Sequence, residues 1–142
     1  MSHIFYISFR IHSTSSSLSS AFYLSTDSIQ RANMDGFNLT TLVTNVTNPA
    51  GIAVDDSRIY WADHLRHSIE SSDLDGCNVQ TVVQLQSGSY PWGLVLHDDR
   101  IYWGTWGKVG AIQSVDKGGK DLCTHYEGLG AVQHLALVTS GV

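Results

Sequence analysis

The side chains with the greatest capacity for chemistry are four tryptophans, seven histidines and two pairs of adjacent aspartates in a chain of 142 residues. Catalysis needs such groups in defined constellations, and the sequence has no Gly-x-Ser-x-Gly elbow, no His-Glu-x-x-His and no Walker loop. Asp55-Asp56 and Asp98-Asp99 fall at expected hairpin turns, where Asp serves turn geometry. His64 and His67 lack an evident third metal ligand. The sequence therefore predicts no enzyme, no cofactor and no metal site.

The overall charge and composition argue against two classes of binding partner, nucleic acids and membranes. A formal net charge of −5 with only eight Lys and Arg argues against a nucleic-acid partner, which needs a basic patch. No stretch approaches the roughly 18–20 apolar residues of a spanning helix, so we expect no direct membrane insertion by this chain. Cys77 and Cys123 are too few for a disulfide framework, and whether they pair is left open.

The chain repeats itself after 42 residues, because Pro49–Trp61 aligns with Pro91–Trp103 without a gap. Each copy has a Pro-x-Gly entry, an apolar strand, a polar turn and an Ile-Tyr-Trp strand. A third strand follows at 68–73 or 111–116, then a Gly-containing hairpin turn and a fourth strand at 79–84 or 121–126. Four short antiparallel strands per repeat of this length are typical of β-propeller blades.

The predicted organisation is all-β and covers part of a six-bladed propeller, with about two full blades and parts of two others. Residues 21–48 are a partial blade in which Phe22-Tyr23-Leu24 takes the place of Ile-Tyr-Trp, 49–90 and 91–131 are complete blades, and 132–142 begin with the first strand of another. Because the chain stops inside a repeat unit, we expect a fragment of a longer protein, with self-association as the alternative.

Residues 1–20 do not match the repeat. They contain a short apolar run broken by Arg10 and then a Ser/Thr-rich stretch that is typical of a linker. A signal peptide ending near Ala21 is one interpretation, because small residues precede that position. A stray strand, or a start that is not a domain boundary, is the other.

The repeat resembles a known family. Ile59-Tyr60-Trp61-Ala62-Asp63 and Ile101-Tyr102-Trp103-Gly104-Thr105 are similar to the Tyr-Trp-Thr-Asp core of the low-density lipoprotein receptor class B repeat. Pro49–Ala53 matches the Pro-x-Gly-Leu-Ala that precedes this core, and Ile29–Gly36 matches the Ile-x-Arg-Ala-x-Leu-Asp-Gly that follows it. The resemblance extends over residues 21–138. In that family, the Asp of the core ties neighbouring strands by hydrogen bonds. In this chain, Asp63 is the residue that retains this Asp at its position.

The resemblance implies a six-bladed propeller in an extracellular protein, or in the ectodomain of a single-pass membrane receptor. Its implied partners are extracellular protein ligands or neighbouring receptor modules such as EGF-like modules, which two cysteines cannot build within this chain. The function we expect is a non-catalytic, protein-binding or structural module. The alternatives are a calcium-dependent propeller hydrolase, which would collect ligands from several blades, and a non-functional partial gene product.

Chain direction places the loop after each second strand and the connection between blades on one face. This face predicts ligand-contact candidates, because large aromatic groups beside polar ones are typical of protein-binding hot spots; the alternative is that they pack between blades. The candidates are Tyr90, Trp92, Trp106, Asn48, Asp63 and His64.

Three further sets of residues are singled out. His64, His67, His97 and His134 are candidate pH sensors, since imidazole titrates near the pH of endosomes, with ordinary surface histidines as the alternative. Asn38 and Asn45 begin Asn-x-Thr triplets that could carry glycans. A core between adjacent sheets is predicted at Tyr60, Trp61, Tyr102 and Trp103.

Overall fold

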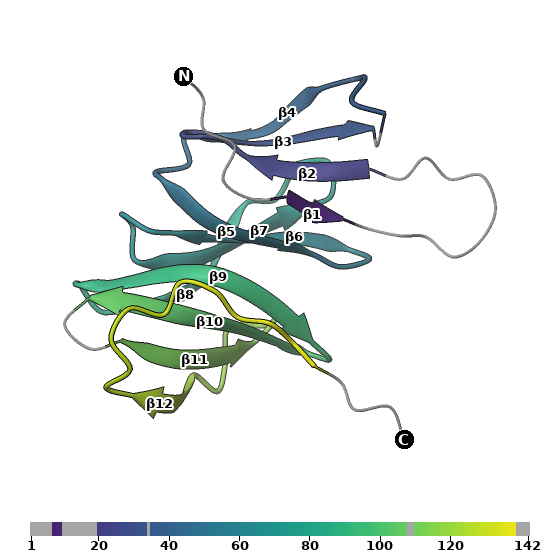
Figure 1. The fold of residues 1–142 in the computed structure, drawn as a ribbon. Coiled ribbons are helices and arrows are strands. Elements are labelled where there is room, and N and C mark those ends of the chain that lie inside the picture. The colour runs from purple at the N-terminus through teal and green to yellow at the C-terminus, as the bar shows by residue number, and fades with distance from the viewer. Residues whose placement is uncertain (1–6, 10–19, 34, 108–109, 139–142) are drawn as a thin grey trace.

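Three four-stranded antiparallel sheets follow one another along the chain (Figure 1). The structure is a computed structural model that describes residues 7–9, 20–33, 35–107 and 110–138. Among these residues, no helix has the length and hydropathy needed to cross a bilayer. The first sheet comprises β1 (Ile7–Phe9), β2 (Ser20–Leu24), β3 (Ser28–Asn33) and β4 (Thr40–Thr44). The second comprises β5 (Pro49–Val54), β6 (Arg58–Asp63), β7 (Ser68–Asp73) and β8 (Gln80–Gln84), and the third β9 (Ser89–His97), β10 (Arg100–Gly107), β11 (Ala111–Asp116) and β12 (Cys123–Glu127).

In the second and third sheets, the strands lie within a few residues of the positions that the periodic pattern predicts. β7 and β11 have the expected bounds, and β6 and β10 contain the two Ile-Tyr-Trp triplets. Side chains alternate between the two faces of a strand, so each Tyr-Trp pair sends one ring to each side of its sheet. The local sequence therefore fixes both the strands and the face that each aromatic ring occupies.

The first sheet has a strand that the repeat did not predict. β1 pairs with β2 through Ile7↔Tyr23, Ser8↔Phe22 and Phe9↔Ala21, so residues outside the repeat supply the innermost strand. The expected register of this sheet was also wrong by one residue. Tyr23 pairs with Gln30, as Trp61 pairs with Glu70, so Phe22-Tyr23 occupies the place of Tyr60-Trp61. The remainder of 1–20 lies outside the described residues.

The segment after β12 differs from expectation. Residues 128–138 form no strand, although the first strand of another blade was predicted within 132–142. Three backbone hydrogen bonds attach this segment to the third blade: from the Leu129 N–H to the Gly110 carbonyl (3.0 Å), from the Val132 N–H to the Thr105 carbonyl (3.2 Å) and from the Gly93 N–H to the Gln133 carbonyl (3.2 Å). A strand requires a ladder of hydrogen bonds with one neighbouring strand, and these separate bonds do not form a ladder.

The core lies between successive sheets. Trp61 faces the first sheet and packs with Phe22 of that sheet and with Ile59 of its own strand, whereas Tyr60 faces the third sheet and packs with Ile101 and Trp103. Tyr60, Trp61 and Trp103 are each at most 2% exposed. Tyr102 departs from the predicted core because it is only half-buried. It lies on the face of the third sheet that points away from the second.

Asp63 joins the first two sheets. It is fully buried and accepts hydrogen bonds from the Thr47 N–H (2.9 Å), the Thr47 hydroxyl (3.0 and 3.1 Å) and the Arg66 N–H (3.0 Å). Thr47 lies in the connection from β4 to β5, so this carboxylate holds the passage from one sheet to the next. The tie agrees with the role that the resemblance implies. It also removes Asp63 from the set of side chains that a ligand can touch.

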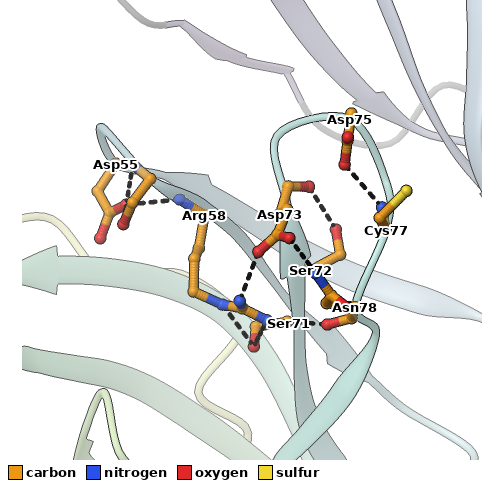
Figure 2. A network of polar contacts seen from close by, with 9 residues as sticks. Asp55, Arg58, Ser71, Ser72, Asp73, Asp75, Cys77 and Asn78 are labelled. Atoms are coloured by element: carbon orange, nitrogen blue, oxygen red, sulfur yellow. Dashed lines mark hydrogen bonds and ion pairs between the residues drawn. The ribbon is translucent and has the colours of Figure 1, made fainter.

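An arginine ties strands together within each of the last two sheets, and Figure 2 shows the first of the two, Arg58. The Arg58 guanidinium pairs with the Asp73 carboxylate at 2.7 Å, and donates to the Ser71 hydroxyl and the Asn78 carbonyl. Arg100, at the same place in the next repeat, donates to the Ser114 hydroxyl at 2.8 Å and to the Asp121 carbonyl at 2.8 Å. Each arginine thereby fastens its second strand to the hairpin between the third and fourth strands.

An ion pair connects the second and third sheets, between the turn that follows β5 and the turn that follows β11. The Lys117 Nζ lies 2.9 Å from an Asp55 carboxylate oxygen, with both side chains mostly buried. Burial alone would raise the pKa of Asp55, but hydrogen bonds from the Ser57 N–H, Lys117 and the Arg58 N–H outweigh it and lower the pKa to about 2. Asp55 is thus ionised at neutral pH, and the pair acts beside the apolar core as a second contact between the sheets.

We expect Trp61→Ala to lower the free energy of unfolding by about 3–5 kcal/mol, because it empties a fully packed site between two sheets. Urea denaturation followed by circular dichroism measures this change. Trp106→Ala is the matched control, since Trp106 is 48% exposed. Equal effects of the two substitutions would contradict the packing described for Trp61.

We expect Asp63→Ala to lower the free energy of unfolding by about 2–4 kcal/mol, because it leaves the buried N–H groups of Thr47 and Arg66 without their acceptor. The same denaturation measurement applies. Asp99→Ala is the control, because Asp99 is exposed and its φ is not positive, so Ala fits its backbone. A loss for Asp63→Ala no greater than the control's would show that the carboxylate does not hold the two sheets together.

Candidate binding site

Five side chains meet where the second and third sheets adjoin, and we call them the aromatic cluster: His64, His67, Tyr90, Trp92 and Trp106. His64 and His67 belong to the loop between β6 and β7. Tyr90 and Trp92 lie near the start of β9, and Trp106 near the end of β10. The antiparallel pairing of β9 with β10 places Tyr90 directly opposite Trp106, which brings both rings to the same end of the sheet.

His64 is the centre of the cluster. Its ring stacks on Tyr90 with centroids 4.8 Å apart, meets Trp92 edge-on at 4.8 Å and lies 6.1 Å from Trp106. The backbone N–H of His64 donates to the Asn48 carbonyl at 3.2 Å, which fixes the loop over the buried Asp63. These separations are within the range of favourable aromatic contacts, so the rings support one another as a unit.

The environment of His64 favours its neutral form. Only 6% of the residue is exposed, and its Nδ1 atom has no hydrogen-bond partner among the described residues. Burial is the main reason that the pKa of His64 is lowered, and His67 lowers it further. The Pro91 carbonyl and Asp63 act in the opposite direction without cancelling the effect of burial. At neutral pH, His64 is therefore an uncharged ring inside the cluster.

His67 fixes the outer side of the cluster. Its Nδ1–H donates to the Ser89 carbonyl at 3.0 Å, and its ring lies 4.8 Å from Tyr90. Sequence reasoning named His67 as a pH sensor and not as a contact residue. Its position three residues after His64 in the same loop was the signal that could have placed it here.

The cluster presents partly exposed aromatic surface. Trp106 is 48% exposed, and Tyr90 and Trp92 are half-buried. Half-exposed aromatic rings held by packing present a large apolar area at little cost in conformational entropy, which is the property of hot-spot residues. The structure thus combines both interpretations of these rings, because they pack between sheets and also reach the surface.

The other predicted site residues are not part of the aromatic cluster. Asn48 is exposed next to the cluster, with a positive φ of 57°. His97 lies at the far end of β9 from Tyr90, with its Nε2 3.4 Å from an Asp98 carboxylate oxygen. His134 is exposed in the segment after β12. The structure therefore does not bring His97 and His134 together with His64 and His67.

A polar cavity of about 350 Å³ adjoins the cluster between the β8–β9 connection and the third sheet. Ser89 and Thr105, the neighbours of Tyr90 and Trp106 in sequence, line it together with Gln86, Gln113 and Glu127. Thr105 stands at the position that Asp63 occupies one repeat earlier, so a shorter, uncharged side chain faces this space. Within the described part of the chain, no three His, Cys, Asp or Glu side chains gather as a metal site would require.

The sequon asparagines and the two cysteines are at the surface. Asn38 and Asn45 are exposed, each with a positive φ, of 57° and 59°. The Asn45 carbonyl accepts a hydrogen bond of 2.8 Å from Arg66. Cys77 and Cys123 are both exposed and unpaired. Sequence reasoning did not single out Arg58 or Arg100, although their recurrence at the same place in two repeats was a usable signal.

A solved structure confirms the predicted architecture. A chain of the nidogen/laminin complex superposes with a TM-score of 0.78 over 90% of this chain and 50% of that chain, at 23% identity. At this identity the likeness shows the fold alone. The all-β prediction of a partial six-bladed β-propeller is thereby confirmed, and each of the three sheets is a blade.

Two receptors are similar to part of this chain. Mouse low-density lipoprotein receptor-related protein 5 is 38% identical over 91 residues, which are 63% of this chain and 6% of that protein. The vitellogenin receptor Yl of Drosophila melanogaster is 37% identical over 81 residues, covering 55% of this chain and 4% of that protein. The matched segment is thus a small part of each receptor. The family model for the low-density lipoprotein receptor repeat class B matches residues 24–55 and 57–97, about half of the chain. The chain therefore belongs to the family of low-density lipoprotein receptor class B repeats.

Proposed function

We propose that this chain is a non-catalytic propeller segment of an extracellular receptor, and that it binds a protein ligand or a neighbouring receptor module through the aromatic cluster. The observation that carries the proposal is the exposure of Trp106 on a rigid base of stacked rings. Neither the cluster nor the polar cavity beside it presents a nucleophile and a base in hydrogen-bonding contact, so contact with a partner is the activity that this geometry supports best.

The composition of the cluster indicates the kind of partner surface. Tyr90, Trp92 and Trp106 are uncharged, and His64 is held neutral at pH 7 by burial. Such a surface pairs with an apolar or aromatic side chain, ringed by polar groups that exclude water. The named relatives are receptors, and Asn38 and Asn45 are exposed enough to carry glycans, so we place the chain in the extracellular space.

The cluster can also respond to pH. Protonation of His64 would put a charge on a buried ring beside His67, at an Nδ1 atom with no hydrogen-bond partner among the described residues, and the nearby Asp63 carboxylate would offset only part of this cost. The loop between β6 and β7 would then lose its packing against β9. His97 and His134 remain candidate pH sensors, although they lie apart from this cluster.

We expect Trp106→Ala to weaken binding to an extracellular protein partner by at least about 10-fold, because it removes the most exposed ring of the cluster. The measurement is a screen of the purified chain against an array of secreted proteins, followed by surface plasmon resonance on each positive partner. Tyr126→Ala is the control, since Tyr126 is an aromatic residue 65% exposed on β12, which is separated from β10 by β11 in the third sheet. Binding that survives Trp106→Ala, or that falls equally with Tyr126→Ala, argues against this site.

We expect the stability of the wild-type chain to fall between pH 7 and pH 5. The folded pKa of His64 is lower than its unfolded value of about 6.5, so its contribution is complete above that value and is lost as the pH falls through the folded pKa. His64→Phe should flatten this dependence, as measured by denaturation at several pH values. His134→Phe, at an exposed position, should leave the profile unchanged. An unaltered profile in His64→Phe would exclude this histidine as the origin of the pH response.

A further inference from the structure

The polar cavity beside the aromatic cluster lies where the third blade lacks a buried carboxylate. In the second blade, the Asp63 carboxylate accepts hydrogen bonds from the N–H and the hydroxyl of Thr47, and so occupies the space beside the β4–β5 connection. Thr105 takes this position in the third blade, and its hydroxyl accepts a hydrogen bond of 2.9 Å from the Ala111 N–H of the same blade. The smaller side chain leaves a cavity of about 350 Å³ beside the β8–β9 connection.

A second replacement makes a wall of this cavity neutral. Gln113 stands where the second blade has Glu70, since each lies opposite the Trp of its own blade. The Glu70 carboxylate is buried and accepts a hydrogen bond from the Thr81 hydroxyl, whereas the Gln113 Nε2 donates to the Thr124 hydroxyl at 3.0 Å. The Gln113 Oε1 atom is buried and has no hydrogen-bond partner among the described residues. A buried acceptor without a donor costs free energy, and a ligand O–H group at this oxygen would reduce that cost.

A second cavity, of about 300 Å³, continues the first toward β8 and β12. Leu85, which is buried, and Leu122, which is 49% exposed, add apolar surface to it. We call the two cavities together the seam trough, because all of their lining residues lie within 84–127, between the second and third blades. Four residues line both cavities: Gln86, Ser89, Gln113 and Glu127.

Contacts within the chain hold one wall of the seam trough in place. The Ser89 N–H donates to the Gln86 carbonyl at 3.0 Å, which closes the turn at the end of the β8–β9 connection. The Ser89 carbonyl in turn bonds with the His67 ring at 3.0 Å. A Cβ atom added at Gly107 would clash with the Gly88 carbonyl oxygen, so the two backbones are in close contact. A preformed wall lowers the entropy that is lost when a ligand binds.

The chemistry of the seam trough fits a neutral ligand with many hydroxyl groups. Hydroxyl and amide side chains both donate and accept hydrogen bonds, as the hydroxyls of a sugar ring do. The C–H groups on the faces of such a ring suit apolar surface of the kind that Leu85 and Leu122 supply. None of the described residues that line the two cavities is Lys, Arg or His, so a phosphate or sulfate would meet no positive charge there. Glu127 is the one carboxylate among them, which is too few for a metal ion.

We propose that the seam trough binds a neutral saccharide of one or two sugar residues. Its hydroxyls bond with Gln86, Ser89, Gln113 and Glu127, and one face of a ring lies against Leu122. A lysine or arginine side chain of a partner is the competing occupant. It would pair with a single exposed carboxylate, and such a pair contributes little in water.

Titration of the 142-residue chain with neutral sugars tests the proposal. The probes are methyl mannoside, methyl galactoside, N-acetylglucosamine, lactose and diacetylchitobiose, and binding is followed by saturation-transfer NMR and isothermal titration calorimetry. We expect at least one of them to bind with a Kd of about 1–10 mM, the order of magnitude for a ligand with so few atoms. Binding to an array of immobilised neutral glycans as well would identify glycans on a carrier as the source, and binding to the free sugars alone would identify soluble saccharides. Both results support the proposal.

Thr105→Asp is the decisive variant, because it places in the third blade the carboxylate that the second blade has at Asp63. We expect it to weaken sugar binding at least about 10-fold, since the added group occupies the space of the ligand. Thr41→Asp is the matched control, because Thr41 is exposed on β4 in the first sheet. Ser89→Ala removes one lining hydroxyl without filling the cavity, and should weaken binding about 3- to 10-fold. Far-UV circular dichroism checks that the variants keep their strands.

Three results would overturn the proposal. The first is that no sugar binds at several times the expected Kd. The second is sugar binding that is unchanged in both Thr105→Asp and Ser89→Ala, which would place the sugar elsewhere. The third is that lysine amide or arginine amide binds in place of the sugars, and more tightly in Thr105→Asp, which would show that the trough takes a cation. No protein partner enters this titration, so its result does not depend on whether the aromatic cluster binds one.

Discussion

The packing of each sheet against the next is the constraint on which the rest of this structure depends. Tyr60 and Trp61 are adjacent in one strand, and they bury their rings on opposite sides of the second blade. An aromatic ring of this size buries on the order of 150–250 Å² and contributes several kcal/mol at about 25 cal/mol per Å². Each blade therefore requires two neighbours, one for each ring.

The candidate site follows directly from this packing. The aromatic cluster lies across the seam between the second and third blades, so neither blade contains the site alone. Asp63 holds the base of the loop by bonds to Thr47 and Arg66, and His64, the next residue, stacks on Tyr90 of the following blade. A residue that fixes the architecture and a residue at the centre of the site are thus neighbours in sequence. Changes that loosen the seam will also alter the exposed rings.

Much of the fold was predictable because its signals are local. The ungapped alignment of Pro49–Trp61 with Pro91–Trp103 predicted the blades, and the bounds of β7 and β11 followed from their turns. The register of the first blade was missed by one residue, because its Phe22-Tyr23 differs from the Tyr-Trp of the other two. β1 was missed because it lies outside the repeat, and its pairing with β2 is not encoded in any spacing along the chain.

The sequence by itself determined the family, the strand order within each blade and the set of aromatic residues on one face. These properties depend on alternation, turn chemistry and the repeat length, which act over a few residues or recur at fixed intervals. The tertiary structure alone decided that Asp63 is buried, that His67 joins the cluster, that Tyr102 lies on an open face and that Cys77 and Cys123 are unpaired. Those outcomes depend on how closely one sheet approaches the next, and that distance is set by the packing of many side chains together.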